Sequence, residues 1–143
     1  MEKKYITKTV AETEAVAKEL AQILKKGDIV ALVGELGAGK TVFARGILKG
    51  FGYFGIVASP TFTIAAEYFL EGIKLVHYDL YRIDDEHMLE ETGFYSYIDE
   101  QAILLIEWGD RVKSVLDDCF IRVFISGSGL DPRSITIETG EAE

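Results

Sequence analysis

The strongest chemical signal in the chain is GELGAGKT, residues Gly34 to Thr41. It matches the complete pattern of a phosphate-binding loop, whose glycines let backbone N–H groups turn inward toward phosphate. Lys40 would then reach the β- and γ-phosphates of a nucleotide, and the Thr41 hydroxyl would bind Mg²⁺. An ordinary glycine-rich turn is the weaker interpretation because the motif is complete. The predicted nucleotide-binding residues are Gly34, Glu35, Leu36, Gly37, Ala38, Gly39, Lys40, Thr41 and Val42.

Two carboxylates follow apolar runs and are expected at strand ends. Asp79 ends KLVHYD, and Glu107 ends ILLIE. A phosphate-binding loop that hydrolyses nucleotide needs an acid at a neighbouring strand end for Mg²⁺ and a group that orients the attacking water. A solvated strand end is the alternative for either acid alone. We predict Lys40, Asp79 and Glu107 as catalytic residues and Thr41, Asp79 and Glu107 as metal ligands, with the metal and water roles of the two acids left undivided.

The segment SPTFTI, residues Ser59 to Ile64, offers hydroxyl groups after a stiff proline. Thr61 or Thr63 could contact Mg²⁺ or the γ-phosphate, as switch loops do. A turn that leads into a strand, with threonine favoured by strand propensity, is an equally good interpretation of the segment alone. His77 is expected inside a strand as a satisfied core or edge histidine, and His87 is expected on the surface.

The base of the nucleotide and the type of reaction are predicted from two motifs that the sequence lacks. The only Lys-x-Asp is Lys26-Gly27-Asp28, which precedes the loop, so a guanine-specific motif is missing and adenine is favoured. Small kinases with this loop usually carry an arginine-rich lid, but the arginines here form no sequence cluster. Arg82 and Arg111 follow the two acidic motifs, where each could approach phosphate or form a structural ion pair.

Hydrophobic periodicity predicts the elements that would position these residues. A helix over 11–26, with Thr9 or Glu12 at its start, precedes a buried strand, the loop and a second helix. Asp84 is the expected N-cap of a later acidic helix. The sequence predicts one α/β domain over 1–143, a P-loop NTPase with a mixed central sheet flanked by helices. The further segments are a strand before a hairpin at Gly72, a strand over 73–83, helices over 84–93, 94–99 and 110–116, and strands over 102–108, 120–126 and 134–140.

Composition narrows the function. The chain has 143 residues, is 48% hydrophobic, and carries a net charge of −9. This charge makes stand-alone nucleic-acid binding a poor prediction and suits a basic protein partner. The longest apolar runs are too short to cross a membrane, and the N-terminus has no apolar signal segment. The lone Cys119 suits a reducing compartment, so a cytoplasmic location is expected.

Four motifs in order, GELGAGKT, SPTFTI, HYDLYR and IEWGDR, resemble the TsaE (YjeE) family of small bacterial P-loop ATPases. The resemblance implies an ATP- and Mg²⁺-dependent ATPase that supports threonylcarbamoyl-adenosine modification of tRNA. It implies action with TsaD and TsaB by regulating or resetting that complex, and only indirect contact with tRNA. Thr61 is similar to the switch threonine of the family. Trp108 is similar to a residue of the nucleotide or partner face, and the residues around Thr9 and Val10 are expected near adenine.

Two other functions are compatible with the loop. A small-molecule kinase would yield a phosphorylated acceptor, whereas an ATPase releases inorganic phosphate. A nucleotide-dependent binding module would bind ATP and a partner without turnover.

Overall fold

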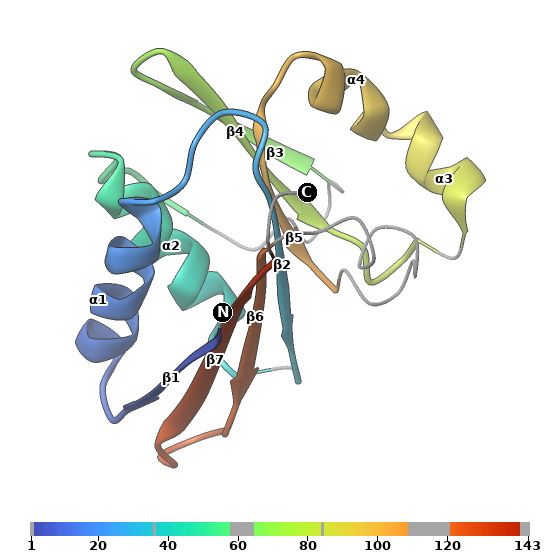
Figure 1. Cartoon of the computed structure of the whole chain (residues 1–143). Helices are drawn as coiled ribbons and strands as arrows, with labels where there is room; N and C mark the ends of the chain where they lie inside the picture. Colours follow the sequence, from blue (N-terminus) through green and yellow to red (C-terminus); the bar gives the residue numbers. More distant parts are fainter. Residues whose placement is uncertain (1, 36, 58–64, 84, 109–120, 141–143) are drawn as a thin grey trace.

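The structure is a computed structural model that describes residues 2–35, 37–57, 65–83, 85–108 and 121–140 (Figure 1). Strands and helices alternate over the first half of the chain, as is typical of an α/β fold. The strands are β1 (Glu2–Thr7), β2 (Ile29–Gly34), β3 (Ala65–Leu70), β4 (Ile73–Asp79), β5 (Ile103–Glu107), β6 (Ile121–Ser126) and β7 (Arg133–Thr139). The helices are α1 (Val10–Ala21), α2 (Lys40–Gly50), α3 (Glu86–Glu91) and α4 (Phe94–Asp99).

The strands of the described residues form one sheet in the order β1-β7-β6-β2-β5-β4-β3. The four central strands, β6, β2, β5 and β4, are parallel, and antiparallel strands flank them on both sides. The apolar runs of β2 and β5 lie in the middle, where a strand is covered on both faces. The predicted mixed α/β fold with a mixed central sheet and flanking helices is confirmed.

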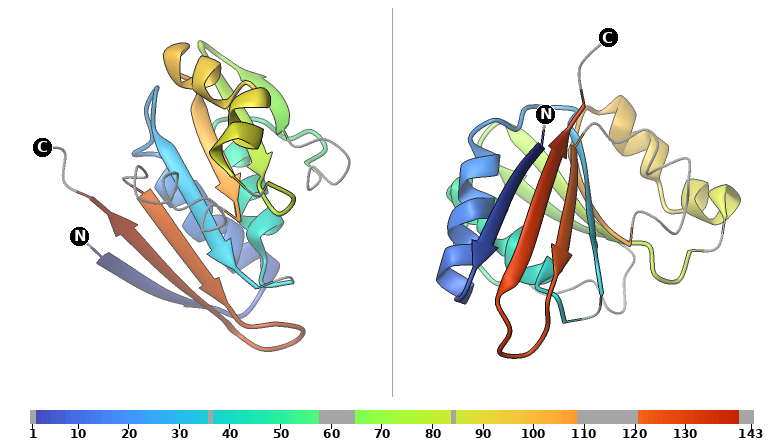
Figure 2. Two further views of the ribbon diagram at one scale, coloured as in Figure 1. Left: turned by 90° about the vertical axis from the view of Figure 1, so that its right-hand side faces the viewer. Right: turned by 60° about the horizontal axis from the view of Figure 1, so that its bottom comes forward.

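Helices cover both faces of this sheet (Figures 1 and 2). Helices α1 and α2 lie on one face, where Leu20, Phe43 and Ile47 pack with inward side chains of the sheet. Helices α3 and α4 lie on the other face, where Leu89 and Phe94 pack with a second apolar cluster. Because alternate residues of a strand face opposite sides, the odd-numbered residues at the ends of β4 and β5 share the face of α2.

Glycines bring α1 and α2 very close together. A Cβ atom on Gly46 would lie 2.6 Å from the Cβ of Ala17, and one on Gly50 would lie 2.5 Å from the Cβ of Ala21. Such separations are shorter than any ordinary carbon–carbon contact, so only glycine fits at these positions. The helix that begins at the phosphate-binding loop is therefore packed directly on the backbone of α1.

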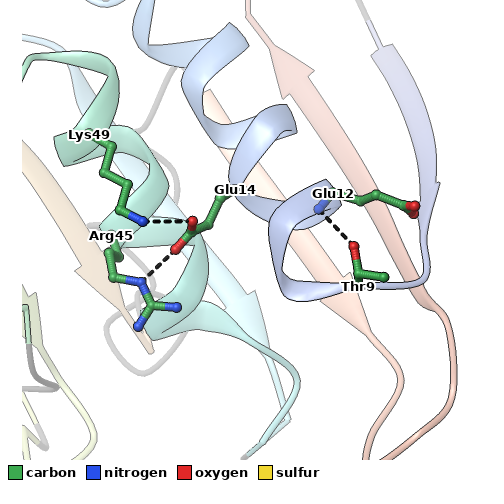
Figure 3. Close-up of polar contacts among 5 residues, drawn as sticks. All are labelled: Thr9, Glu12, Glu14, Arg45 and Lys49. Carbon is green, nitrogen blue, oxygen red and sulfur yellow. Dashed lines mark hydrogen bonds and ion pairs between the residues drawn. The ribbon is translucent and has the colours of Figure 1, made fainter.

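A buried carboxylate joins the same two helices. Glu14 of α1 accepts hydrogen bonds from Arg45 (2.5 Å) and Lys49 (2.9 Å), which lie one turn apart on α2 (Figure 3). Burial alone would raise the pKa of Glu14, but the hydrogen bonds and charges of Lys49 and Arg45 outweigh burial and hold this pKa below its ordinary value. The ion pairs fix the rotation of α2 against α1 as the glycines fix their distance.

Several predicted boundaries were wrong. Helix α1 ends at Ala21, five residues before the predicted Lys26, because the chain turns there and Asp28 accepts a hydrogen bond from the Lys25 N–H. Strand β4 ends at Asp79, since Asp79 accepts a hydrogen bond from the Tyr81 N–H and so turns the chain.

The predicted caps had mixed outcomes. Thr9 caps α1 by accepting a hydrogen bond from the Glu12 N–H at 3.0 Å, as predicted (Figure 3). Asp85 caps α3 in place of the predicted Asp84, because its carboxylate accepts a hydrogen bond from the Met88 N–H. Strand β1 was not predicted, since its sequence EKKYIT lacks alternation and only its pairing with β7 makes it a strand. The helix predicted over 110–116 lies outside the described residues.

Candidate nucleotide site

The phosphate-binding loop, residues 34–41, connects β2 to α2 beside the central strands. Gly37 and Gly39 have φ angles of +81° and +108°, which side chains other than glycine rarely tolerate. Gly34 packs against β6, where an added Cβ would lie 2.5 Å from the Ile125 carbonyl oxygen. The glycines of the motif are thus required by backbone conformation and by close packing. Leu36 lies outside the described residues.

Lys40 points back into the loop. Its Nζ donates a hydrogen bond to the Gly34 carbonyl at 2.6 Å and lies 3.5 Å from the centroid of the Trp108 ring. The residue is only 5% exposed. A cation on an aromatic face in so dry a place is held by electrostatic attraction to the ring. The ammonium group therefore lies at the centre of the loop, between its first carbonyl and the tryptophan.

Trp108 directly follows β5 and is half-buried. Its φ angle of +60° is unusual for a bulky residue and turns the chain away from the strand direction. The Tyr81 ring lies beside it, with centroids 5.0 Å apart. The expected position of Trp108 near the nucleotide loop agrees with its contact with Lys40, while its role there stays a prediction.

The two predicted acids are neighbours. Strand β5 lies between β2 and β4, and Asp79 pairs in register with Glu107 across the parallel strands. Leu32 of the loop strand pairs with Glu107 on the other side. Glu107 is 3% exposed, so a solvated strand end is the wrong interpretation for this residue, whereas Asp79 is partly exposed.

His77 is the partner that explains why Glu107 is buried. Its side chain is fully buried, and its Nε2 lies 2.5 Å from Oε2 of Glu107. Its Nδ1 has no hydrogen-bond partner among the described residues. The prediction of a core histidine was correct about burial but missed this contact, because nothing local indicates that β4 and β5 are adjacent. His87, in contrast, is exposed as predicted.

The oxygen donors at the site suit Mg²⁺ better than a metal that needs a protein cage. Thr41 lies in the first turn of α2, and the two carboxylates end adjacent strands. Within the described ranges, no three side chains of His, Cys, Asp or Glu gather to hold a metal. Mg²⁺ commonly takes one or two protein oxygens and completes its shell with water and substrate phosphates. The donor set fits such an ion.

A cavity of about 160 Å³ adjoins the loop and is called the hairpin cavity below. Residues 7–10, from the end of β1 to the start of α1, form one wall, and residues 129–131, between β6 and β7, form another. Gly39 and Val42 of the loop and α2 complete it together with Arg133. The residues expected near adenine, Thr9 and Val10, therefore lie beside the phosphate-binding loop.

Arg133 is a contact that the sequence did not predict. Its guanidinium donates to the carbonyls of Ala38 (2.9 Å) and Gly37 (3.4 Å) in the loop, and to those of Asp131 (2.6 Å) and Gly129 (3.3 Å) in the β6–β7 hairpin. The loop and the arginine are 95 residues apart in sequence, so no motif could have indicated the contact.

The other predicted residues are divided between the surface and undescribed segments. Arg82 is exposed beside the turn after β4, and Arg45 pairs with Glu14 rather than with the phosphate-binding loop. Thr61, Thr63 and Arg111 lie outside the described residues, so the switch prediction stays a prediction. None of the helices in the described part of the chain has the length and apolarity needed to cross a membrane.

Known proteins with similar sequences belong to the family that the four ordered motifs resemble. Residues 7–135 match the family TsaE, described as the threonylcarbamoyl adenosine biosynthesis protein TsaE. The tRNA threonylcarbamoyladenosine biosynthesis protein TsaE of Bacillus subtilis (strain 168) is 41% identical over 133 residues, covering 93% of this chain and 83% of that protein. The Haemophilus influenzae protein of the same name is 42% identical over 113 residues, covering 76% and 72%. A crystal structure of Bacillus subtilis YdiB superposes with a TM-score of 0.79 at 33% identity, covering 99% of this chain and 87% of that one.

Proposed function

Since the chain belongs to the TsaE family of threonylcarbamoyl adenosine biosynthesis, we propose that it binds Mg-ATP and hydrolyses it in support of that tRNA modification. The observation that carries the proposal is the position of Lys40. Its buried ammonium group lies inside the phosphate-binding loop and against Trp108, the residue that directly follows Glu107, and Glu107 pairs in register with Asp79 of the neighbouring strand. Few sites other than one for a nucleoside triphosphate would place these groups together.

The proposed binding mode follows from the loop and its cavity. The N–H groups of the loop and the N-terminus of α2 bind the β- and γ-phosphates, with Lys40 moving from the Gly34 carbonyl to phosphate oxygen. The base enters the hairpin cavity beside Thr9 and Val10. Adenine is the proposed base because the chain lacks a guanine-specific motif. Mg²⁺, when bound, neutralises phosphate charge and is held by Thr41 with a strand-end carboxylate.

The two acids are proposed to have different roles, with Asp79 on the Mg²⁺ side and Glu107 orienting the attacking water. Asp79 is partly exposed and has one oxygen engaged by the Tyr81 N–H. Glu107 is buried, and His77 fixes one of its oxygens, so the other oxygen is oriented without free rotation. A fixed carboxylate is suited to orienting water, and an exposed one to a hydrated Mg²⁺ ion.

The proposed partners are TsaD and TsaB, and tRNA is contacted only through their complex. The proposed location is the cytoplasm. The net charge of −9 supports indirect contact with tRNA, because a chain so acidic repels the phosphates of tRNA yet attracts a basic protein surface. ATP hydrolysis would then regulate or reset the complex rather than transfer the threonylcarbamoyl group.

The test is phosphate release from Mg-ATP, with and without purified TsaD and TsaB. The variant Lys40→Ala should abolish release while its circular dichroism spectrum stays unchanged. Lys18→Ala is the matched control, because Lys18 is an exposed lysine on α1. Release that rises with the partners and is lost only in Lys40→Ala supports the proposal.

Other outcomes would replace it. Bound ATP without phosphate release, even with both partners, would indicate a binding module. Phosphate that appears on an added small molecule instead of in solution would indicate a kinase. Equal turnover in Lys40→Ala and wild type would overturn the site assignment itself.

A further inference from the structure

Arg133 lies at the beginning of β7, where it reaches two loops that are far apart in sequence, the phosphate-binding loop and the β6–β7 hairpin. Three of its nitrogens, Nε, Nη1 and Nη2, donate to four main-chain carbonyls. Two of these carbonyls belong to the phosphate-binding loop and two to the β6–β7 hairpin. A guanidinium supplies five donors in a rigid planar fork, and no other side chain could make this set of bonds.

The contact with Ala38 controls the direction of a loop N–H. The Ala38 carbonyl and the Gly39 N–H belong to one planar trans peptide unit, so the two groups point in opposite directions. Because Arg133 holds the carbonyl at 2.9 Å, the Gly39 N–H is directed away from the arginine. Gly39 itself has a φ angle of +108° and would otherwise be free to rotate among several conformations. The donor just before Lys40 is therefore oriented before any anion binds.

Arg133 also forms part of the hairpin cavity. It lines that cavity together with Gly129 and Asp131, whose carbonyls it binds. The wall of the cavity and the phosphate-binding loop are thus attached to the same guanidinium. Within the described part of the chain, Arg133 forms no ion pair with a carboxylate, so its charge adds to the positive potential at the loop.

We propose that Arg133 is a positioning residue for nucleotide binding, which orients the phosphate-binding loop and couples it to the hairpin wall of the adjoining cavity. This inference rests on the proposed function, since it assumes a nucleoside triphosphate as the ligand. It predicts that the loss of Arg133 weakens binding of the phosphate chain even though the arginine need not touch phosphate.

The experiment compares Arg133→Ala, Arg133→Lys and a control, Arg122→Ala. Arg122 is a half-buried strand arginine of β6, near the end of that strand opposite the hairpin. The dissociation constants of Mg-ATP and of inorganic tripolyphosphate are measured by calorimetry, at a temperature where circular dichroism shows every variant folded. The chemical shift of the Gly39 amide is recorded by NMR in each protein without nucleotide.

Arg133→Ala should weaken both ligands by about tenfold or more, because several hydrogen bonds to a charged group are lost. Arg133→Lys should lie between, since an ammonium keeps the charge but not the fork. Arg122→Ala should change either constant by no more than about twofold. The chemical shift of the Gly39 amide should differ between Arg133→Ala and wild type in the absence of nucleotide. If Arg133 only stabilised the fold, neither this chemical shift nor the affinity of the folded protein would change.

Three results would overturn one claim or the other. If wild type binds Mg-ATP but Arg133→Ala matches Arg122→Ala, the positioning role is wrong and the proposed function survives. If Arg133→Ala weakens Mg-ATP but not tripolyphosphate, Arg133 supports only the cavity wall, and loop positioning is wrong. If wild type binds neither ligand, the proposed function itself fails. Should Arg133→Ala not fold, Arg133→Lys provides the same comparison.

Discussion

The ion pairs between α1 and α2 allow one perturbation to be worked through quantitatively. Replacing Glu14 with Gln removes the charge that Arg45 and Lys49 share, while keeping the size of the side chain (Figure 3). Both cations then stay on α2 without their carboxylate. Glu19→Gln is the matched control, because Glu19 is an exposed residue of the same helix.

The expected loss of unfolding free energy in Glu14→Gln lies between the values for a fully buried and a fully exposed ion pair. Removing one partner of a fully buried pair costs about 3–5 kcal/mol, whereas an exposed pair contributes about 0.2–1 kcal/mol. The Glu14 side chain is 12% exposed, and those of Arg45 and Lys49 are 34% and 29% exposed. We expect Glu14→Gln to lower the free energy of unfolding by about 2 kcal/mol and the melting temperature by about 6 °C.

The pH dependence of this effect has a definite sign. Burial would raise the pKa of Glu14, but Lys49 and Arg45 together lower it below 4.5 in the folded state. Above that ordinary value, the carboxylate is ionised in both states and its stabilising effect is complete. As the pH falls below 4.5, the unfolded chain takes up the proton first, and the stabilisation is lost as the pH falls through the folded-state pKa.

The assay is urea unfolding of wild type, Glu14→Gln and Glu19→Gln, followed by circular dichroism at several pH values. The difference between wild type and Glu14→Gln should be constant from neutral pH to about pH 5 and should shrink below it. The reasoning is refuted if Glu14→Gln unfolds like Glu19→Gln at neutral pH, or if the difference persists undiminished in acid.

Three further experiments test the packing of the helices and the candidate nucleotide site. Gly46→Ala should destabilise the fold by about 2 kcal/mol although alanine favours helix, because the new Cβ would lie 2.6 Å from the Cβ of Ala17 and 2.9 Å from both the Cα and the carbonyl oxygen of Glu14. Chemical unfolding measures this loss, and a variant as stable as wild type would contradict the close packing of the two helices. His77→Ala should lower ATP turnover by about tenfold or more with little change in Mg-ATP affinity, and His77→Gln, which keeps a donor for Glu107, should lower it less; equal losses in both variants would contradict a positioning role. The emission of Trp108, the only tryptophan, should change when Mg-ATP draws Lys40 from its ring, and an unchanged emission on saturation with Mg-ATP would contradict this movement of Lys40.

The phosphate-binding loop and the elements around it were predictable because their signals are local. The glycines, Lys40 and Thr41 occupy adjacent positions, and an apolar run before them with a helical pattern after them needs no distant contact to be interpreted. The two acids were predictable as strand ends for the same reason. Thr9 was one of two predicted caps for α1, because an N-cap is formed by residues three apart.

Only the tertiary structure decided which of these local pieces meet. The order of parallel strands depends on how crossover helices pack, and this placed β5 between β2 and β4 and so brought Glu107 beside Asp79 and His77. The reach of Arg133 to Ala38 depends likewise on a hairpin far along the chain. Short-range spacing therefore determined what the loop can bind, whereas long-range packing decided how its groups are oriented, since side-chain direction between distant segments has no counterpart in local sequence.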